Sequence, residues 1–189
     1  MMTQPTVIFF GPDGILYNSD NCKIFLRTLL FSTAKKGQVL ESLHVSIQRN
    51  ESKQNFNIWV YGEKGDLKRG SGLFVPQEGV VYDHHFLLPK DGADFKFFEG
   101  KYKLIVYAKL VGKTQTMKLS TIDLYLSQSH AGELAKPNVG LFYDWGPDQQ
   151  SYYAHIDTKP PADPRMNELY EAIWNKMISG KENSNAIPK

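Results

Sequence analysis

An alternating run between Gly100 and Val111 is the feature of this chain that most constrains its fold. Successive side chains of a β-strand point to opposite faces, so the run predicts a strand with two different faces. One face carries Tyr102, Leu104, Val106, Ala108 and Leu110. The other carries Lys101, Lys103, Ile105, Tyr107 and Lys109. We expect the first face to lie in a core, and the second either to be covered by residues 128–179 or to be left open for a partner.

Further β-type runs occur along the chain, with segments rich in Gly, Pro, Asp and Asn between them. They span residues 6–10, 22–32, 43–49, 56–61, 80–88 and 117–126. The run 22–32 is apolar on both sides, which favours a central strand. In 43–49 the alternation places Leu43, Val45 and Ile47 inward, and in 56–61 it places Phe56, Ile58 and Val60 inward, with Trp59 and Tyr61 on the opposite face. Residues 101–111 and 117–126 are predicted to form a hairpin.

Several strands at roughly ten-residue spacing end here with Gly100-x-Tyr102-x-Leu104-x-Val106 and a partner strand. This pattern resembles an immunoglobulin or fibronectin type III sandwich and covers residues 6–127. The resemblance implies an antiparallel, Ig-like β-sandwich in which Tyr102 forms a tyrosine corner. The Cys…Trp…Cys spacing of antibody domains is missing from the sequence. Sandwiches of this kind support many functions, so the resemblance implies no particular activity.

The composition changes after Ser127. Residues 128–138 are predicted to be a polar linker, and 139–145 with 151–157 a second hairpin around Gly146-Pro147-Asp148. After Asp163-Pro164, apolar residues recur at the spacing of an amphipathic C-terminal α-helix; they are Met166, Leu169, Tyr170, Ile173, Trp174 and Met177. We therefore expect an all-β fold class. Residues 1–127 are expected to form the sandwich, and residues 128–180 an extension, made of a hairpin and a helix, that packs on the sandwich. We expect residues 181–189 to form a flexible tail.

The overall charge and the hydropathy pattern limit the range of partners. A net charge of +2 is too small for a protein whose binding is dominated by phosphate contacts, so we expect no nucleic-acid partner. The sequence contains no apolar run approaching the ~20 residues of a membrane span and begins with no signal-peptide pattern, which predicts a cytoplasmic location and no membrane association. The single cysteine, Cys22, cannot form an intrachain disulfide.

Catalytic and metal-binding motifs are not recognisable. The sequence has no Gly-x-Ser-x-Gly elbow, and the segment from Gly65 to Gly72 has Ser and Gly where a P-loop requires Lys and then Ser or Thr. The cluster Asp83-His84-His85 contains two common metal ligands, but in a strand the two histidines point to opposite faces and cannot share one ion. We therefore expect no catalytic residue, no metal site and no cofactor.

Aromatic residues are the best candidates for binding. They are Trp59, Tyr61, Tyr143, Trp145, Tyr152 and Tyr153, with Trp174 on the C-terminal helix. These side chains either close one end of the core or form a binding surface. The primary hypothesis is a non-enzymatic protein-interaction module that contacts another protein or its own copy. The alternative is a carbohydrate-binding or carbohydrate-processing domain that uses Tyr143, Trp145 and Tyr152 as a platform for a glycan. The helix docks on its own sandwich or enters the groove of a partner.

Overall fold

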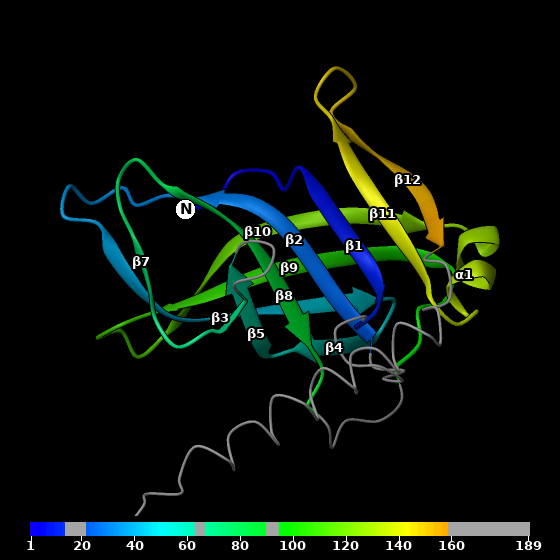
Figure 1. Ribbon diagram of the computed structural model, residues 1–189, viewed down its shortest axis with the longest axis horizontal. Coiled ribbons are helices and arrows are strands. Elements are labelled where there is room, and N and C mark those ends of the chain that lie inside the picture. The colour runs from blue at the N-terminus through cyan, green and yellow to red at the C-terminus, as the bar shows by residue number, and fades with distance from the viewer. Residues whose placement is uncertain (14–21, 63–66, 90–94, 159–189) are drawn as a thin grey trace, which may run out of the picture. The chain divides into compact units, whose positions relative to one another are not determined.

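Two antiparallel β-sheets pack face to face in the computed structural model of the chain (Figure 1). The structure describes residues 1–13, 22–62, 67–89 and 95–158. The expected C-terminal helix with Trp174, and the tail 181–189, lie outside these residues. No helix in the described part of the chain has the length and apolarity needed to cross a membrane.

The larger sheet has seven strands. Their order is β12 (Ser151–Thr158), β11 (Val139–Gly146), β1 (Val7–Pro12), β2 (Cys22–Leu30), β8 (Val80–Leu87), β5 (Ile58–Gly62) and β6 (Lys68–Arg69). The strands expected at 6–10, 22–32 and 80–88 are confirmed, and β2 occupies the predicted central position. The second hairpin is also confirmed as β11 and β12. Its strand β11 pairs with β1, so the hairpin extends the sheet that the N-terminal strand begins.

The smaller sheet contains β10 (Thr116–Leu126), β9 (Gly100–Leu110), β3 (Gln38–Arg49) and β4 (Ser52–Phe56), in that order. The short strand β7 (Leu73–Val75) pairs with the beginning of β3. The hairpin predicted from residues 101–111 and 117–126 is confirmed as β9 and β10. A register shift between Lys118 and Ser120 interrupts the β9–β10 ladder.

The core lies between the two sheets and is built from the alternating faces that the sequence predicts. Leu104, Val106 and Ala108 of β9 are each no more than 2% exposed. Leu43, Val45 and Ile47 of β3 are buried in the same way. From the larger sheet, β1 contributes Ile8 and Phe10, and β2 contributes Ile24 and Leu26. One continuous apolar layer therefore holds both sheets together, as in other sandwiches.

The run 56–61 differs from its predicted form. It is not one strand, because β4 ends at Phe56 in the smaller sheet and β5 begins at Ile58 in the larger one, with Asn57 between them. This change of sheet shifts the alternation by one residue. Phe56 and Trp59 therefore face the core, at 0% and 3% exposure, whereas Ile58 and Val60 are only half-buried. The prediction that Trp59 and Tyr61 lie on the outward face, with Ile58 and Val60 inward, was wrong.

The segment expected to be a polar linker contains a short helix, α1 (Gln128–Leu134). The side chain of Ser127 accepts a hydrogen bond from the backbone N–H of His130 and caps its N-terminus. None of its residues is fully buried, so the helix lacks the apolar stripe that reveals most helices in a sequence. The boundary expected at Ser127 falls between β10 and α1.

Tyr102 occupies the position that suggested a tyrosine corner. Its hydroxyl donates to the carbonyl oxygen of Phe98 at 2.6 Å and accepts from the N–H of the same residue at 2.9 Å. The ring is buried, and desolvation raises the pKa of the phenol. These bonds fix the segment before β9 against the core. The all-β sandwich is thus established, whereas the finer assignment to an Ig or fibronectin type III domain stays a prediction.

Candidate functional site

Trp59 and Tyr61 lie on the inner face of β5, where their rings stack with centroids 4.7 Å apart. The indole N–H of Trp59 donates to Nδ1 of His84 at 3.2 Å. The hydroxyl of Tyr61 donates to the carbonyl oxygen of Gly72 at 3.2 Å. Trp59 is buried and Tyr61 is half-buried. The contacts of both side chains are therefore with the interior of the sandwich.

Tyr143 is also an interior residue, at 2% exposure. Its ring meets that of Phe10 edge-on, with centroids 5.4 Å apart, and its hydroxyl donates to the carbonyl oxygen of Tyr125 at 3.1 Å. Burial raises the pKa of the phenol well above its ordinary value. This hydrogen bond links β11 of one sheet to β10 of the other.

Trp145 and Tyr152 form a second aromatic pair, in a T-shaped arrangement with centroids 5.0 Å apart. The hydroxyl of Tyr152 donates to the carbonyl oxygen of Pro5 at 2.8 Å and accepts from the side chain of Gln4 at 3.0 Å. Tyr153 points to the opposite face of the sheet and is 46% exposed. The structure thus pairs Trp59 with Tyr61, both on β5, and Trp145 of β11 with Tyr152 of β12. Tyr153 faces solvent. Trp174 lies outside the described residues.

An open groove that the sequence did not reveal crosses the outer face of the larger sheet over β1, β2, β11 and β12. We call it the outer groove; it is lined by Val7, Phe25, Arg27, Phe142, Asp144, His155 and Asp157. Its space is about 300 Å³, at the lower end of the range for small-molecule sites. The residues come from four strands, so strand periodicity alone cannot bring them together.

The floor of the outer groove is aromatic, and its rim is charged. The rings of Phe142 and His155 stack with centroids 5.5 Å apart and an interplanar angle of 14°. Nδ1 of His155 lies 3.2 Å from a carboxylate oxygen of Asp144, which orients the ring and leaves Nε2 as its second polar atom. Both side chains are about half exposed, so this contact contributes little to stability.

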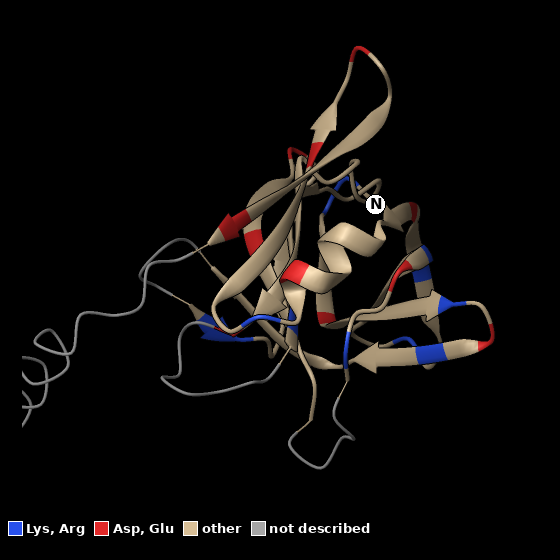
Figure 2. Cartoon of the chain, turned by 90° about the vertical axis from the view of Figure 1, so that its right-hand side faces the viewer, with Lys and Arg blue, Asp and Glu red and all other residues tan. Residues whose placement is uncertain are grey.

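On the β2 side of the groove, Arg27 makes a bidentate pair with Asp83 of β8, at 2.7 and 3.0 Å. The hydrogen bonds to Asp83 raise the pKa of the guanidinium. The rim of the groove therefore has a cation at one side and the carboxylates of Asp144 and Asp157 at the other. Across the rest of the described chain, basic and acidic residues are interspersed (Figure 2).

His84 and His85 point to opposite faces of β8, as the sequence predicted. His84 is 1% exposed in the core, and desolvation lowers its pKa to about 4. His85 packs against Phe25 on the outer face, and burial lowers its pKa to about 4 as well. Within the described residues, no group of three or more His, Cys, Asp or Glu side chains is arranged to hold a metal ion.

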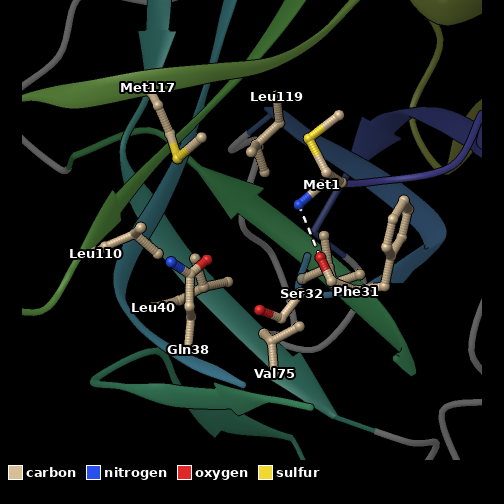
Figure 3. Close-up of a pocket in the computed structure, with 10 residues that line it drawn as sticks. Met1, Phe31, Ser32, Gln38, Leu40, Val75, Leu110, Met117 and Leu119 are labelled. Carbon is tan, nitrogen blue, oxygen red and sulfur yellow. Dashed lines mark hydrogen bonds between the residues drawn. The ribbon is translucent and has the colours of Figure 1, made fainter. Parts of the chain in front are cut away.

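A second cavity lies between the sheets near the beginning of the chain (Figure 3). Leu40 and Leu110 come from the smaller sheet, and the amino group of Met1 donates to the carbonyl oxygen of Phe31 at 2.8 Å. The cavity volume is about 20 Å³, which is room for about one water molecule. It is too small for a ligand, so the outer groove is the better candidate of the two.

The strand β12 forms one edge of the larger sheet (Figure 1). The backbone N–H of Trp145 donates to the carbonyl oxygen of Thr6, so this residue directs its backbone polar groups toward β1. In a strand these groups alternate in direction, so Asp144 and Phe142 bond to their partners on β12, Tyr153 and His155. It follows that the intervening residues of β12 direct their N–H and C=O groups away from the sheet. These residues are Tyr152, Ala154 and Ile156.

Comparisons of this chain with protein-family models, with curated proteins and with solved structures found no match.

Proposed function

We propose that this protein is a non-enzymatic protein-interaction module that binds an extended strand of its partner along β12. The observation that carries the proposal is the regular row of backbone groups at the outer edge of β12, at Tyr152, Ala154 and Ile156. Such a row is a template for strand addition, in which main-chain hydrogen bonds supply affinity and alternate side chains supply specificity.

The other edges of the two sheets carry features that oppose strand addition. β6 has two residues, β7 has three and β4 has five, one of them Lys53. β10 is long, but it is interrupted by the register shift after Lys118, and the carbonyl oxygen of Tyr125 is occupied by the hydroxyl of Tyr143. Short strands, bulges and lysines are the common means of protecting an edge.

β12 carries none of these three features, although the helix α1 contacts it. It has eight residues in unbroken register with β11, and its sequence contains no Pro, Lys or Arg. Its outward face presents Tyr153 and His155, the kind of ring-bearing side chains that add contact area at an interface. A partner strand here would gain backbone hydrogen bonds and aromatic contacts together.

The test is a selection that does not require the partner to be known. A display library of random extended peptides is selected against the wild-type protein and then compared with the variant Ala154→Pro. Proline removes the outward N–H of residue 154 and leaves the bonds to β11 in place. We expect the selected peptides to bind the variant at least tenfold more weakly. Equal binding to both proteins would place the peptides elsewhere and reject the β12 edge.

A second candidate function is binding of a small glycan in the outer groove. The observation that favours it is the flat stack of Phe142 on His155, flanked by the carboxylates of Asp144 and Asp157. Aromatic faces beside carboxylates suit sugar rings and their hydroxyl groups. A glycan panel followed by saturation-transfer NMR, with His155→Ala as the groove variant and Val81→Ala as an outer-face control, tests this candidate. A signal that both variants retain would exclude the groove.

A further inference from the structure

We propose that the strand added to β12 is β12 of a second copy of this chain, antiparallel, with the twofold axis at Ala154. This inference rests on the proposed function, because it identifies the partner at the same edge. It also fixes a register, which makes it more restrictive than the statement that the protein forms dimers.

The direction of the backbone groups limits the possible registers. In an antiparallel pair, residues whose N–H and C=O point to the partner must face one another, so a twofold axis through a hydrogen-bonded pair must pass at Tyr152, Ala154 or Ile156. The strand spans Ser151–Thr158, and Ala154 is the outward-bonding residue nearest to its centre. Among axes through a hydrogen-bonded pair, the one at Ala154 gives the longest overlap, with about six backbone hydrogen bonds between the copies. An axis at His155, through a non-hydrogen-bonded pair, would overlap as far but would place the two His155 side chains directly opposite one another.

The side chains agree with this register on both faces of the strand. On the inner face, Tyr152 lies opposite Ile156 of the partner subunit. The Tyr152 ring already packs on Trp145 and its hydroxyl bonds to Pro5, so only the remaining side of the ring is left for this contact. Both residues are half-buried in the single chain, so they have surface left to cover. The small side chain of Ala154 stands at the axis, directly opposite Ala154 of the partner subunit.

On the outer face, Tyr153 lies opposite His155 of the partner subunit. Tyr153 is 46% exposed and the His155 side chain is 54% exposed, so both gain cover. Asp157 lies opposite Ser151 of the partner subunit, and no two like charges face one another in this register. An axis at Ile156 would also place His155 opposite Asp157 of the partner subunit. Tyr152 would then lie opposite a position after Thr158, the last described residue of the strand.

The dimer would also complete the outer groove. His155 and Asp157 form the β12 side of that groove, at the edge of the sheet. In the proposed register, Tyr153 of the partner subunit is the residue directly opposite His155 and extends this side. Two grooves would then run into one another across the axis, and each would take one wall residue from the other copy.

Light scattering after size exclusion tests the association with the full chain. The single chain has a mass of 21.5 kDa, so the dimer is expected at about 43 kDa, twice that value. We expect Ala154→Pro to shift the protein to the monomer. The double variant Tyr153→Lys/His155→Lys should act in the same way, because it changes two exposed side chains and places lysines opposite lysines. Val81→Lys, at a position 56% exposed on β8, is the matched control and should remain dimeric.

Cross-linking of single cysteines tests the register without relying on a variant that weakens the association of the two copies. In a Cys22→Ser background, cysteine is placed at Tyr152, Ala154 or Ile156 and treated with a short bis-methanethiosulfonate. The axis at Ala154 brings the two copies of residue 154 to about 5.5 Å between Cα atoms, and separates the copies of 152 or of 156 by about 14 Å. We expect efficient linkage only at position 154.

The outcomes separate this inference from the proposed function. A wild-type monomer at about 100 μM, whose edge still binds selected peptides in an Ala154-dependent manner, would overturn the second copy and leave strand addition standing. A dimer that Ala154→Pro and the double lysine variant both leave intact would overturn the β12 interface. Preferred linkage at 152 or 156 would overturn the register. Linkage at 154 with loss of the dimer in both variants supports the inference in full.

Discussion

The indole N–H of Trp59 and Nδ1 of His84 form a hydrogen bond of 3.2 Å in the interior of the sandwich, between the neighbouring strands β5 and β8. Nδ1 accepts this bond, so the neutral imidazole carries its proton on Nε2. Nε2 is buried, and no described group bonds to it. One hydrogen bond therefore stabilises the pair, whereas the burial of Nε2 without a partner costs free energy.

Trp59→Phe is expected to lower the free energy of unfolding by about 2 to 4 kcal/mol, through a cavity and the unpartnered Nδ1 of His84. Urea unfolding followed by circular dichroism measures the change. Phe25→Leu, on the half-buried outer face of β2, is the control and should cost less. A cost for Trp59→Phe no larger than that of the control would contradict the interior role of the indole.

Stability is expected to fall as the pH is lowered from about 6.5 to about 4. Desolvation holds the pKa of His84 at about 4 in the folded chain, whereas an unfolded histidine has a pKa near 6.5. Below pH 6.5 the unfolded state therefore binds a proton that the folded state does not bind, which favours unfolding. The loss from His84 amounts to at most about 3 kcal/mol and is complete near pH 4.

Replacement of the pair by apolar residues tests the source of this pH dependence. In Trp59→Phe/His84→Leu the slope of unfolding free energy against pH should flatten between pH 6.5 and 4 by the contribution of His84. His85 remains and retains its own contribution, because burial also lowers its pKa to about 4. Parallel curves for the wild type and the double variant would show that His84 titrates normally.

Gly70→Ala and Gly132→Ala are expected to have opposite effects. A Cβ atom at Gly70 would stand 2.1 Å from the Trp59 ring, so alanine there must displace the indole and should destabilise by about 1 to 3 kcal/mol. At Gly132 of α1 no atom lies within 4 Å of the added Cβ, and alanine should stabilise by up to about 1 kcal/mol. Thermal unfolding of both variants measures the difference, and a destabilised Gly132→Ala would contradict the placement of α1.

Tyr102→Phe is expected to cost about 1 to 3 kcal/mol, because it removes both hydrogen bonds to Phe98 and leaves a backbone donor and acceptor unpaired. Tyr107→Phe is the matched control in the same strand; its ring stacks on His44 at the outer face, with centroids 4.9 Å apart. The control should change stability by less than about 0.5 kcal/mol. Similar losses of unfolding free energy in the two variants would show that the hydroxyl of Tyr102 does not stabilise the fold.

Much of the fold was predictable because alternation along a strand reports which side is buried. The inward faces of β3 and β9 follow directly from it. Alternation carries no information about a change of sheet, so it predicts neither the step at Asn57 nor the inward direction of Trp59 and Tyr61. A signal for α1 was present in Ser127, a good N-cap residue, but Gly132 and Pro137 suggested a linker and there was no apolar stripe to outweigh them.

The candidate site was less predictable than the fold. Aromatic content drew attention to Tyr143 and Trp145, whereas the groove depends on which strands are neighbours. Phe25 and Phe142 line one groove only because β1 lies between β2 and β11. Likewise, the composition of β12 was visible in the sequence, but its position at an edge follows from pairing across the whole chain.

The pairing of β1 with β11 has a consequence for how the chain is made. Phe10 near the start of the chain pairs with Leu141, so the larger sheet closes only after nearly all of the described residues have been synthesised. Until then β1 can pair with β2 on one side alone, and its other side stays open. Contacts this distant in sequence slow folding and leave intermediates prone to association. Expression at lower temperature, or with a chaperone present, should therefore raise the yield of folded protein more than changes at the surface do.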